Sequence, residues 1–383
     1  WKQQLGTVQK APPVLADGKI YVGTETGKFF ILKPHNDRCE VLSEVEMPES
    51  KESAGGSQGT PEQILAGAAI SRGRVFFVSS DALYAIGSKR ATAPTGFAVD
   101  DPVEKGEGSP AWVQVTPTEL VLKPGQAVKL HARLYDDKGR FLREEKAEWS
   151  LAGLKGAVSD GTLTVGNDAS FQGGTIKATV GGISGEARAR VIPNLPISES
   201  FESYAVNSSP PGWVNAIAGK FVVTELDGHK VLQKPPDETL FKRIRMFFGP
   251  VEWHDYTYEG DVRVNMRRRQ MGDIGLTAQR YSLVLYGNTQ KLKIEPWEPE
   301  IERSVTVPFE WVQDKWYHLK LRVENLPDGS VRARGKAWAT GDPEPANWMI
   351  EKVDKIGHRQ GSPGVFLDAQ FGAYLDNLKV TAN

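Results

Sequence analysis

Short runs of alternating apolar and polar residues recur along the whole chain, separated by Gly, Pro, Asp and Asn. Residues 13–23 have the pattern of a strand, a Gly turn and a second strand, and residues 68–78 repeat that pattern. A third short apolar run follows each repeat, at 29–32 and at 83–86. Helical periodicity is nearly absent, so the pattern predicts an all-β protein built from hairpins.

The middle of the chain, residues 111–193, has the clearest alternation. Apolar residues at 128, 130, 132 and 134 alternate with polar or aromatic ones, and the same period returns at 176–180 and 187–191. A strand with one buried and one wet face has this period of two. The pattern predicts a sandwich domain in which Trp149 is a core residue of a central strand.

Residues 197–383 are predicted to form one larger β unit. Its clearest element is a hairpin of two strands, 316–323 and 331–338, joined by a turn that contains Asp328 and Gly329. Trp213, Trp316 and Trp338 are expected in the core of this unit. Residues 92–110, rich in Pro, Gly and acidic residues, are predicted to be a linker, and Pro193 to Pro196 a short stiff joint.

The charge balance removes one class of function. Lys plus Arg number 47 and Asp plus Glu number 48, so no global charge draws the chain onto nucleic acid. A single cysteine, Cys39, excludes a disulfide within the chain. No apolar run approaches the roughly 18 residues of a membrane helix, and an integral membrane protein is not expected.

The N-terminal repeats resemble the quinoprotein-like (PQQ-like) β-propeller repeat. Pro13 to Gly23, with Asp17-Gly18 and Tyr21-Val22-Gly23, follows the family's pattern, and Trp1 fits the tryptophan that ends a preceding blade. The resemblance implies two blades in residues 1–91. Because two blades cannot close a propeller, we expect the chain to be the C-terminal part of a longer protein whose remaining blades complete it. No PQQ is expected in this fragment.

Two further resemblances extend over the rest of the chain. Residues 111–193, with Val115-Thr116-Pro117 and Ala147-Glu148-Trp149-Ser150, resemble the bacterial immunoglobulin-like group-2 domain, which implies a spacer. Residues 197–383, with Phe201-Glu202 near the start and Tyr374 to Leu378 near the end, resemble concanavalin A-like (laminin-G-like) jelly rolls. That resemblance implies carbohydrate or protein binding.

The candidate ligand-binding residues combine cations with aromatic rings. They are Arg267, Arg268, Arg269, Tyr281, Tyr286 and Trp297. Arginine pairs with acidic groups in a bidentate manner, and aromatic rings offer an apolar surface with a polar edge, so this set predicts binding of a polysaccharide or a surface protein. The competing interpretation is a solvated strand or loop.

A structural Ca²⁺ is the one cofactor for which the sequence offers ligands. Glu202 and Asp376 lie near the two ends of the jelly-roll segment, and paired terminal strands would bring them together. Carboxylate oxygens are the ligands Ca²⁺ prefers, and related sandwiches hold such an ion. Capping of strand ends is the competing interpretation.

Evidence for catalysis in the sequence is weak. Glu298, Glu300 and Glu302 alternate as one strand face requires, but prolines interrupt the run. The string from Gly55 to Gly59 matches Gly-x-Ser-x-Gly without the strand and helix that a nucleophile elbow needs. The six histidines are dispersed, which disfavours a zinc site.

Taken together, these patterns and resemblances predict a non-enzymatic, periplasmic or extracellular cell-surface protein whose jelly roll recognises a glycan or a surface protein. Two alternatives stay open: a fragment of a quinone-dependent dehydrogenase with its active site in the missing propeller, and a glycoside-acting jelly-roll enzyme.

Overall fold

The computed structural model describes residues 1–6, 9–50, 60–71, 73–87, 106–215, 219–236, 243–267, 269–297 and 301–383. Every regular element in these ranges is a β-strand, so the all-β prediction is confirmed for the part of the chain that is described. The chain divides into two compact units, Trp1–Val103 and Glu104–Asn383. Most of the predicted linker and the Gly55–Gly59 string lie outside the described residues.

The N-terminal unit contains two antiparallel sheets. One has the order β1-β2-β3-β4 and the other β5-β6-β7. Their bounds are β1 Val14–Ala16, β2 Lys19–Gly23, β3 Lys28–Pro34, β4 Cys39–Glu46, β5 Ala69–Ser71, β6 Arg74–Val78 and β7 Leu83–Ile86. The expected strands are therefore present. Phe29 of β3 stacks on Phe77 of β6 at 4.3 Å between ring centroids, which joins the two sheets in one small core.

The middle sandwich, residues 111–193, has three small sheets around a single core. Its strands are β8 Trp112–Thr116, β9 Glu119–Leu122, β10 Ala127–Lys129, β11 His131–Tyr135, β12 Phe141–Glu145, β13 Glu148–Ala152, β14 Gly156–Ser159, β15 Thr162–Val165, β16 Gln172–Val180 and β17 Ile183–Val191. The alternation is confirmed, since Leu130, Ala132 and Leu134 are buried. Trp149 differs from expectation: it is only half-buried and packs against the rim of the core.

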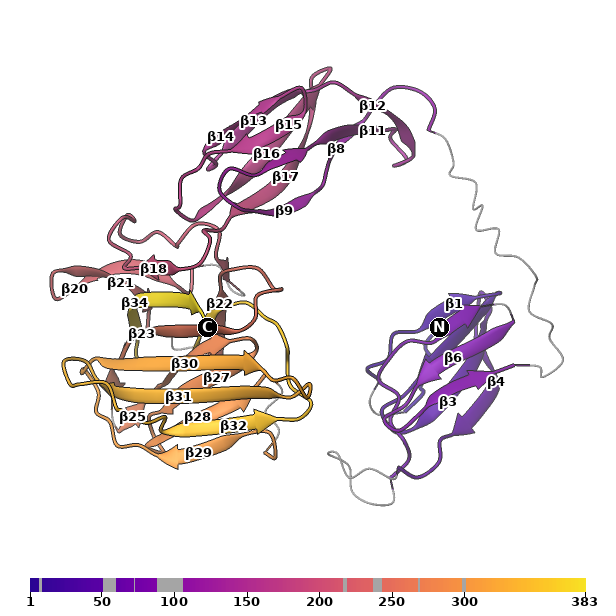
Figure 1. The fold of residues 1–383 in the computed structure, drawn as a ribbon. Coiled ribbons are helices and arrows are strands. Elements are labelled where there is room, and N and C mark those ends of the chain that lie inside the picture. The colour runs from indigo at the N-terminus through magenta and orange to yellow at the C-terminus, as the bar shows by residue number, and fades with distance from the viewer. Residues whose placement is uncertain are drawn as a thin grey trace. The chain divides into compact units, whose positions relative to one another are not determined.

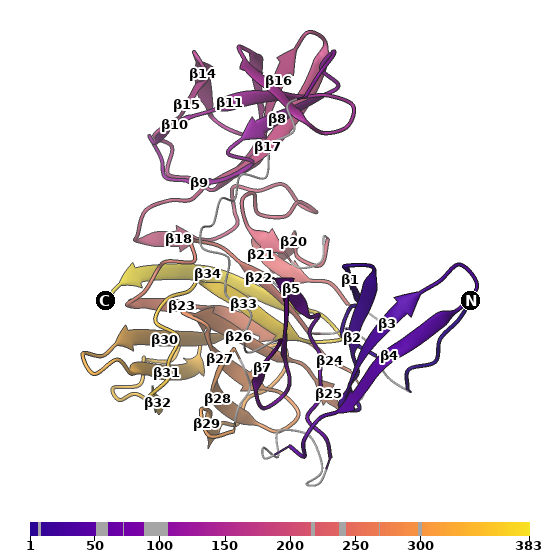
Figure 2. The ribbon, with the colours of Figure 1, turned by 90° about the vertical axis from the view of Figure 1, so that its right-hand side faces the viewer.

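The C-terminal sandwich, residues 197–383, consists of two large sheets with a core between them, as in a jelly roll (Figures 1 and 2). The eight-stranded sheet contains β18 Ile197–Glu199, β20 Val222–Leu226, β21 His229–Lys234, β34 Ala373–Ala382, β23 Tyr256–Val264, β30 Tyr317–Asn325, β31 Val331–Ala339 and β32 Ile350–Asp354. The seven-stranded sheet has the order β19 Val214–Asn215, β22 Arg243–Phe247, β33 Gly364–Asp368, β26 Asp273–Ala278, β27 Tyr281–Tyr286, β28 Lys291–Pro296 and β29 Val305–Pro308. A short hairpin, β24 Met266–Arg267 and β25 Gln270–Met271, lies beside them.

The predicted hairpin is β30–β31, and its alternation fixes which side chains enter the core. Leu319 and Leu321 point inward, whereas His318 and Lys320 point outward. Trp213 is buried as expected. Trp316 and Trp338 are not: both are half-exposed, and Trp338 lies on the outer face with its ring 4.6 Å from that of His318. The core-facing neighbours of Trp338 are Ala337 and Ala339.

The middle and C-terminal sandwiches are joined by more than the connecting segment. Phe171, which directly precedes β16, is buried in the core of the C-terminal sandwich. Its ring lies edge-on at 5.8 Å from both Trp213 and Phe248. A Cβ on Gly173 would lie 2.4 Å from the backbone nitrogen of Gly212, so the two backbones touch there. This junction holds the two sandwiches on either side of a cavity.

Candidate functional site

The outer face of the seven-stranded sheet carries the candidate site. In β22, Ile244 and Met246 enter the core, so Arg243, Arg245 and Phe247 project from the other face. The same alternation applies along each neighbouring strand. It places these side chains on the same outer face: Phe366 and Asp368 from β33, Asp273 and Thr277 from β26, Ser282 and Tyr286 from β27, and Lys293 and Glu295 from β28.

Trp297, the first residue after β28, is the most exposed aromatic ring at this face, with 39% of its surface accessible. The guanidinium carbon of Arg245 lies 4.5 Å from the Trp297 ring centroid and 4.9 Å from that of Phe366. Arg280 lies 6.0 Å from the same indole. Burial, reinforced by the neighbouring charge of Arg243, lowers the pKa of Arg245. We call Trp297, Arg245, Arg280, Phe247 and Phe366 the Trp297 face.

A row of titratable groups adjoins the Trp297 face. Tyr286 donates a hydrogen bond to Glu295 Oε1 at 3.1 Å, and Lys293 donates to Glu295 Oε2 at 2.6 Å. Asp273 accepts a bond from the Gly287 N–H at 2.9 Å. Burial raises the pKa of Asp273 to about 6, and the negative charges of Asp368 and Glu295 add to this effect. The face therefore holds two carboxyl groups: Asp273, whose pKa burial raises, and Glu295, which is bonded to Tyr286 and Lys293.

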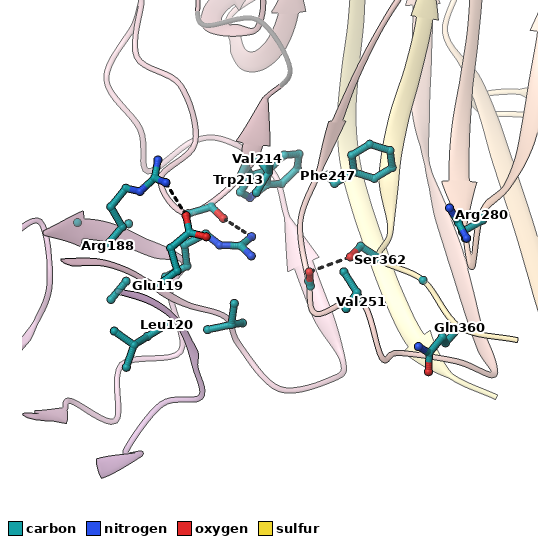
Figure 3. A pocket seen from close by; sticks show the side chains of 18 of the residues that line it. Glu119, Leu120, Arg188, Trp213, Val214, Phe247, Val251, Arg280, Gln360 and Ser362 are labelled. Carbon is teal, nitrogen blue, oxygen red and sulfur yellow. Dashed lines mark hydrogen bonds and ion pairs between the residues drawn. The ribbon is translucent and has the colours of Figure 1, made fainter. Parts of the chain in front are cut away.

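A cavity of about 1010 Å³ adjoins the Trp297 face and separates it from the middle sandwich (Figure 3). Phe247, Trp297 and Arg280 line it from the C-terminal sandwich. Arg188 and Arg190 of β17 line it from the middle sandwich. The remaining lining residues are Glu119, Leu120, Val121, Gly173, Gly174, Thr175, Ala189, Gly212, Trp213, Val214, Gly249, Val251, Gln360, Gly361 and Ser362.

The polar groups of the cavity wall are held by local bonds. Arg188 forms an ion pair with Glu119 at 2.7 Å, and both side chains are largely exposed. Arg190 donates from Nη1 to the carbonyl of Gly212 at 3.3 Å, and its burial lowers the pKa of its guanidinium. On the other wall, Ser362 donates to the carbonyl of Gly249 at 3.0 Å. The cavity is thus a mixed apolar and cationic space.

The two predicted tyrosines lie on opposite faces of β27, because five positions separate them and side chains alternate along a strand. Tyr286 is on the outer face near Trp297. Tyr281 is fully buried on the core side, where its hydroxyl donates to Asp354 Oδ2 at 2.8 Å and accepts from the His358 N–H at 3.1 Å. Tyr281 is therefore a core residue and does not reach a surface ligand.

The predicted arginine cluster falls on the β24–β25 hairpin. Arg267 and Arg269 are exposed there, and Arg268 lies outside the described residues. The guanidinium groups placed against Trp297 among the described residues are those of Arg245 and Arg280. Arg245 belongs to the basic run upstream of the predicted cluster in the sequence, whereas Arg280 sits in the β26–β27 turn with φ of 67° and had no signal in the sequence.

Glu202 lies close enough to Asp376 for its charge to act on that carboxyl. Asp376 of β34 is opposite Asp261 of β23 in the strand register. Burial raises the pKa of Asp376 to about 6, and the charges of Asp261 and Glu202 contribute. Glu202 also accepts a bond from the Lys230 N–H at 3.1 Å. Within the described ranges, no group of three or more His, Cys, Asp or Glu side chains is arranged to hold a metal ion.

Of the sequence candidates for catalysis, Glu302 is exposed in a turn, whereas Glu298 and Glu300 lie outside the described residues. Across the described part of the chain, no helix has the length and apolar character needed to cross a membrane.

Comparison with known proteins gives distant structural similarity only. No family model matches the sequence, and no curated protein matches it. A bifunctional GH43-CE protein of Bacteroides eggerthii shares 15% identity over 96% of this chain and 47% of its own, with a TM-score of 0.34. The present chain therefore spans about half the length of that protein.

Two smaller structures match about half of this chain. An alginate lyase mutant in complex with an alginate trisaccharide shares 11% identity over 49% of this chain and 98% of its own, with a TM-score of 0.34. A Bacillus subtilis protein with a galectin-like fold shares 11% identity over 48% and 98%, with a TM-score of 0.32. Scores this low do not define a shared fold, so the description of the site rests on the residues of this chain.

Proposed function

We propose that the C-terminal sandwich binds a polysaccharide on the Trp297 face without cleaving it. The observation that carries the proposal is the half-exposed Trp297 ring, held by Arg245 at 4.5 Å and open to a cavity of about 1010 Å³. Ligand sites are typically concave, mostly apolar, and furnished with a few oriented polar groups. An indole packs against the C–H face of a sugar ring, and arginines bind the sugar's oxygen atoms.

The test uses the full chain and a panel of neutral and anionic polysaccharides, with retention in affinity gels as the readout. We expect retention by at least one polysaccharide and its loss in Trp297→Ala. Trp112→Ala is the matched control, because Trp112 is exposed on β8 and does not line the cavity. Equal retention of wild type and Trp297→Ala, or capture of a surface protein with no polysaccharide bound, would contradict the proposal.

A second candidate function, action on a glycosidic bond, is favoured by one specific observation. Asp273, with its pKa raised to about 6, and Glu295 project from the same outer face. Glycosidases use a pair of carboxyl groups, one of them with a raised pKa. This candidate predicts steady release of reducing ends that is abolished by Asp273→Asn, whereas the binding proposal predicts no release by wild type.

The proposal also assigns a family to each of the three domains. The four-stranded antiparallel sheet β1–β4 supports a propeller blade, the middle sandwich supports an immunoglobulin-like group-2 domain, and the two large sheets support a concanavalin A-like jelly roll. We also propose an exported, periplasmic or extracellular setting. The alternative of a quinone-dependent dehydrogenase predicts PQQ-dependent oxidation of a substrate.

Calcium remains part of the proposal as a structural ion. The charges of Asp261 and Glu202 oppose ionisation of Asp376, and a divalent cation bound by Glu202 and Asp376 would relieve that effect. A rise in melting temperature on adding Ca²⁺, reversed by a chelator, would support this site.

A further inference from the structure

We propose that the middle sandwich supplies half of the glycan site, and that the preferred ligand is an acidic, uronate-containing polysaccharide. Arg188 and Arg190 would bind its carboxylates while Trp297 and Arg280 hold the sugar rings from the opposite wall. This inference rests on the proposed function of the Trp297 face. It gives the middle sandwich a role beyond that of the spacer its sequence suggested.

The two walls are fixed relative to one another by the buried junction. Phe171 of the middle sandwich is only 5% exposed and lies within the aromatic cluster of Trp213 and Phe248. Trp213 and Phe248 in turn stack at 4.2 Å. Arg190 bonds across the junction to the Gly212 carbonyl. A site built from both walls is therefore organised before a ligand arrives, which lowers the entropic cost of binding.

The charges on the cavity wall favour an acidic ligand. Among the described residues that line the cavity, Arg188, Arg190 and Arg280 are cationic and Glu119 is the one carboxylate. Glu119 is paired with Arg188, but that pair is exposed on both sides and such pairs contribute little. A ligand carboxylate can replace Glu119 on Arg188 and accept two parallel N–H bonds from the guanidinium.

The remaining wall favours a sugar chain over a compact anion. Phe247, Val214, Val251 and Val121 line the same cavity and offer apolar surface to C–H groups. Figure 3 shows Arg188 and Glu119 on one wall and Phe247, Arg280 and Ser362 on the other. The volume, about 1010 Å³, is at the upper end of small-ligand sites and accommodates several sugar residues. Alternating acidic and apolar features of a uronate chain match this lining.

The experiment measures binding to the full chain by calorimetry at low salt. The probes are tetrasaccharides of galacturonate, mannuronate and hyaluronan, each paired with its carboxyl-reduced, neutral counterpart. We expect at least one acidic probe to bind about tenfold tighter than its neutral partner, a difference of about 1.4 kcal/mol. Arg188→Ala should remove that preference while leaving the neutral probe unchanged.

Two further variants sharpen the result. Glu119→Gln should tighten the acidic probe severalfold, because it frees Arg188 without adding a new contact. Arg143→Ala is the matched control, since Arg143 is an exposed, ion-paired arginine of the same sandwich that does not line the cavity. It should bind like wild type, which separates a local contact from a general effect of net charge.

The outcomes distinguish this inference from the function on which it rests. Equal affinity for acidic and neutral probes, with no effect of Arg188→Ala or Glu119→Gln, overturns the two-walled acidic site while glycan binding at Trp297 stands. Binding that Trp297→Ala leaves intact overturns the proposed function. Failure of every acidic and neutral probe to bind overturns the acidic site, and retention on the polysaccharide panel then decides whether glycan binding at Trp297 stands.

Discussion

Replacing Phe171 by alanine should destabilise the C-terminal sandwich although Phe171 belongs to the middle one. The side chain is 5% exposed and lies edge-on to two rings, Trp213 and Phe248, at 5.8 Å each. Burial of a phenylalanine contributes about 1.5–3 kcal/mol, and each aromatic pair adds about 0.5–1.5 kcal/mol. Full core substitutions of Phe cost about 3–5 kcal/mol. Because Phe171 lies at the edge of the core, where neighbours can collapse, we expect about 3 kcal/mol.

The assay is urea unfolding of the full chain, followed by tryptophan fluorescence and by calorimetry. Phe141→Ala is the matched control, because Phe141 is a half-exposed ring of the same sandwich that contacts Tyr135 rather than the C-terminal core. We expect that control to cost about 1 kcal/mol or less. The reasoning is refuted if Phe171→Ala costs no more than Phe141→Ala, or if only the transition of the middle sandwich shifts.

Three other predictions concern stability. Trp149→Ala should cost about 2 kcal/mol in denaturant melts, below the 3–5 kcal/mol of a fully buried aromatic, because Trp149 is half-buried; a loss above about 4 kcal/mol would contradict that placement. Burial lowers the pKa of His318, but hydrogen bonds to Asp261 outweigh this effect and raise it to about 9. The pKa of His318 in the folded state exceeds the unfolded value near 6.5, so the stability that His318 adds is full below pH 6.5 and is lost as pH rises through 9. If the unfolding free energy of His318→Gln falls over pH 6.5–9 as much as that of wild type, this reasoning is wrong. Burial raises the pKa of Asp376 to about 6, so its ionised form is unfavourable in the fold and Asp376→Asn should raise the melting temperature at pH 7. The same variant should abolish any rise in melting temperature caused by Ca²⁺. A calcium response that persists in Asp376→Asn would exclude Asp376 as a ligand.

The alternation of residue types predicted the strands well, and residue size misled the assignment of the core. Leu319 and Leu321 follow the expected period, and the same period places Trp338 outside, between core-facing Ala337 and Ala339. A large indole was expected in the core because burial of aromatic rings is usual. Strand parity, which is a geometric property of the backbone, determined the outcome.

The candidate site could be predicted only in part, because its pieces come from segments far apart in the sequence. Trp297 and Tyr286 were identified from residue type and proximity in the sequence. Arg188 alternates with buried Ala187 and Ala189, which predicts a surface position but not a cavity. The cavity depends on the junction at Phe171, a lone aromatic between two strands, and no local pattern predicts which core such a residue enters.

The measurement that tests the central claim most directly is hydroxyl-radical footprinting of the full chain with and without a bound acidic oligosaccharide. Three exposed or half-exposed indoles report on three separate surfaces: Trp297 at the proposed site, Trp112 on the middle sandwich and Trp338 on the eight-stranded sheet. We predict that the ligand protects Trp297 from oxidation and leaves Trp112 and Trp338 unchanged. Protection of Trp338 with Trp297 still reactive would place the ligand on the other sheet and contradict the account.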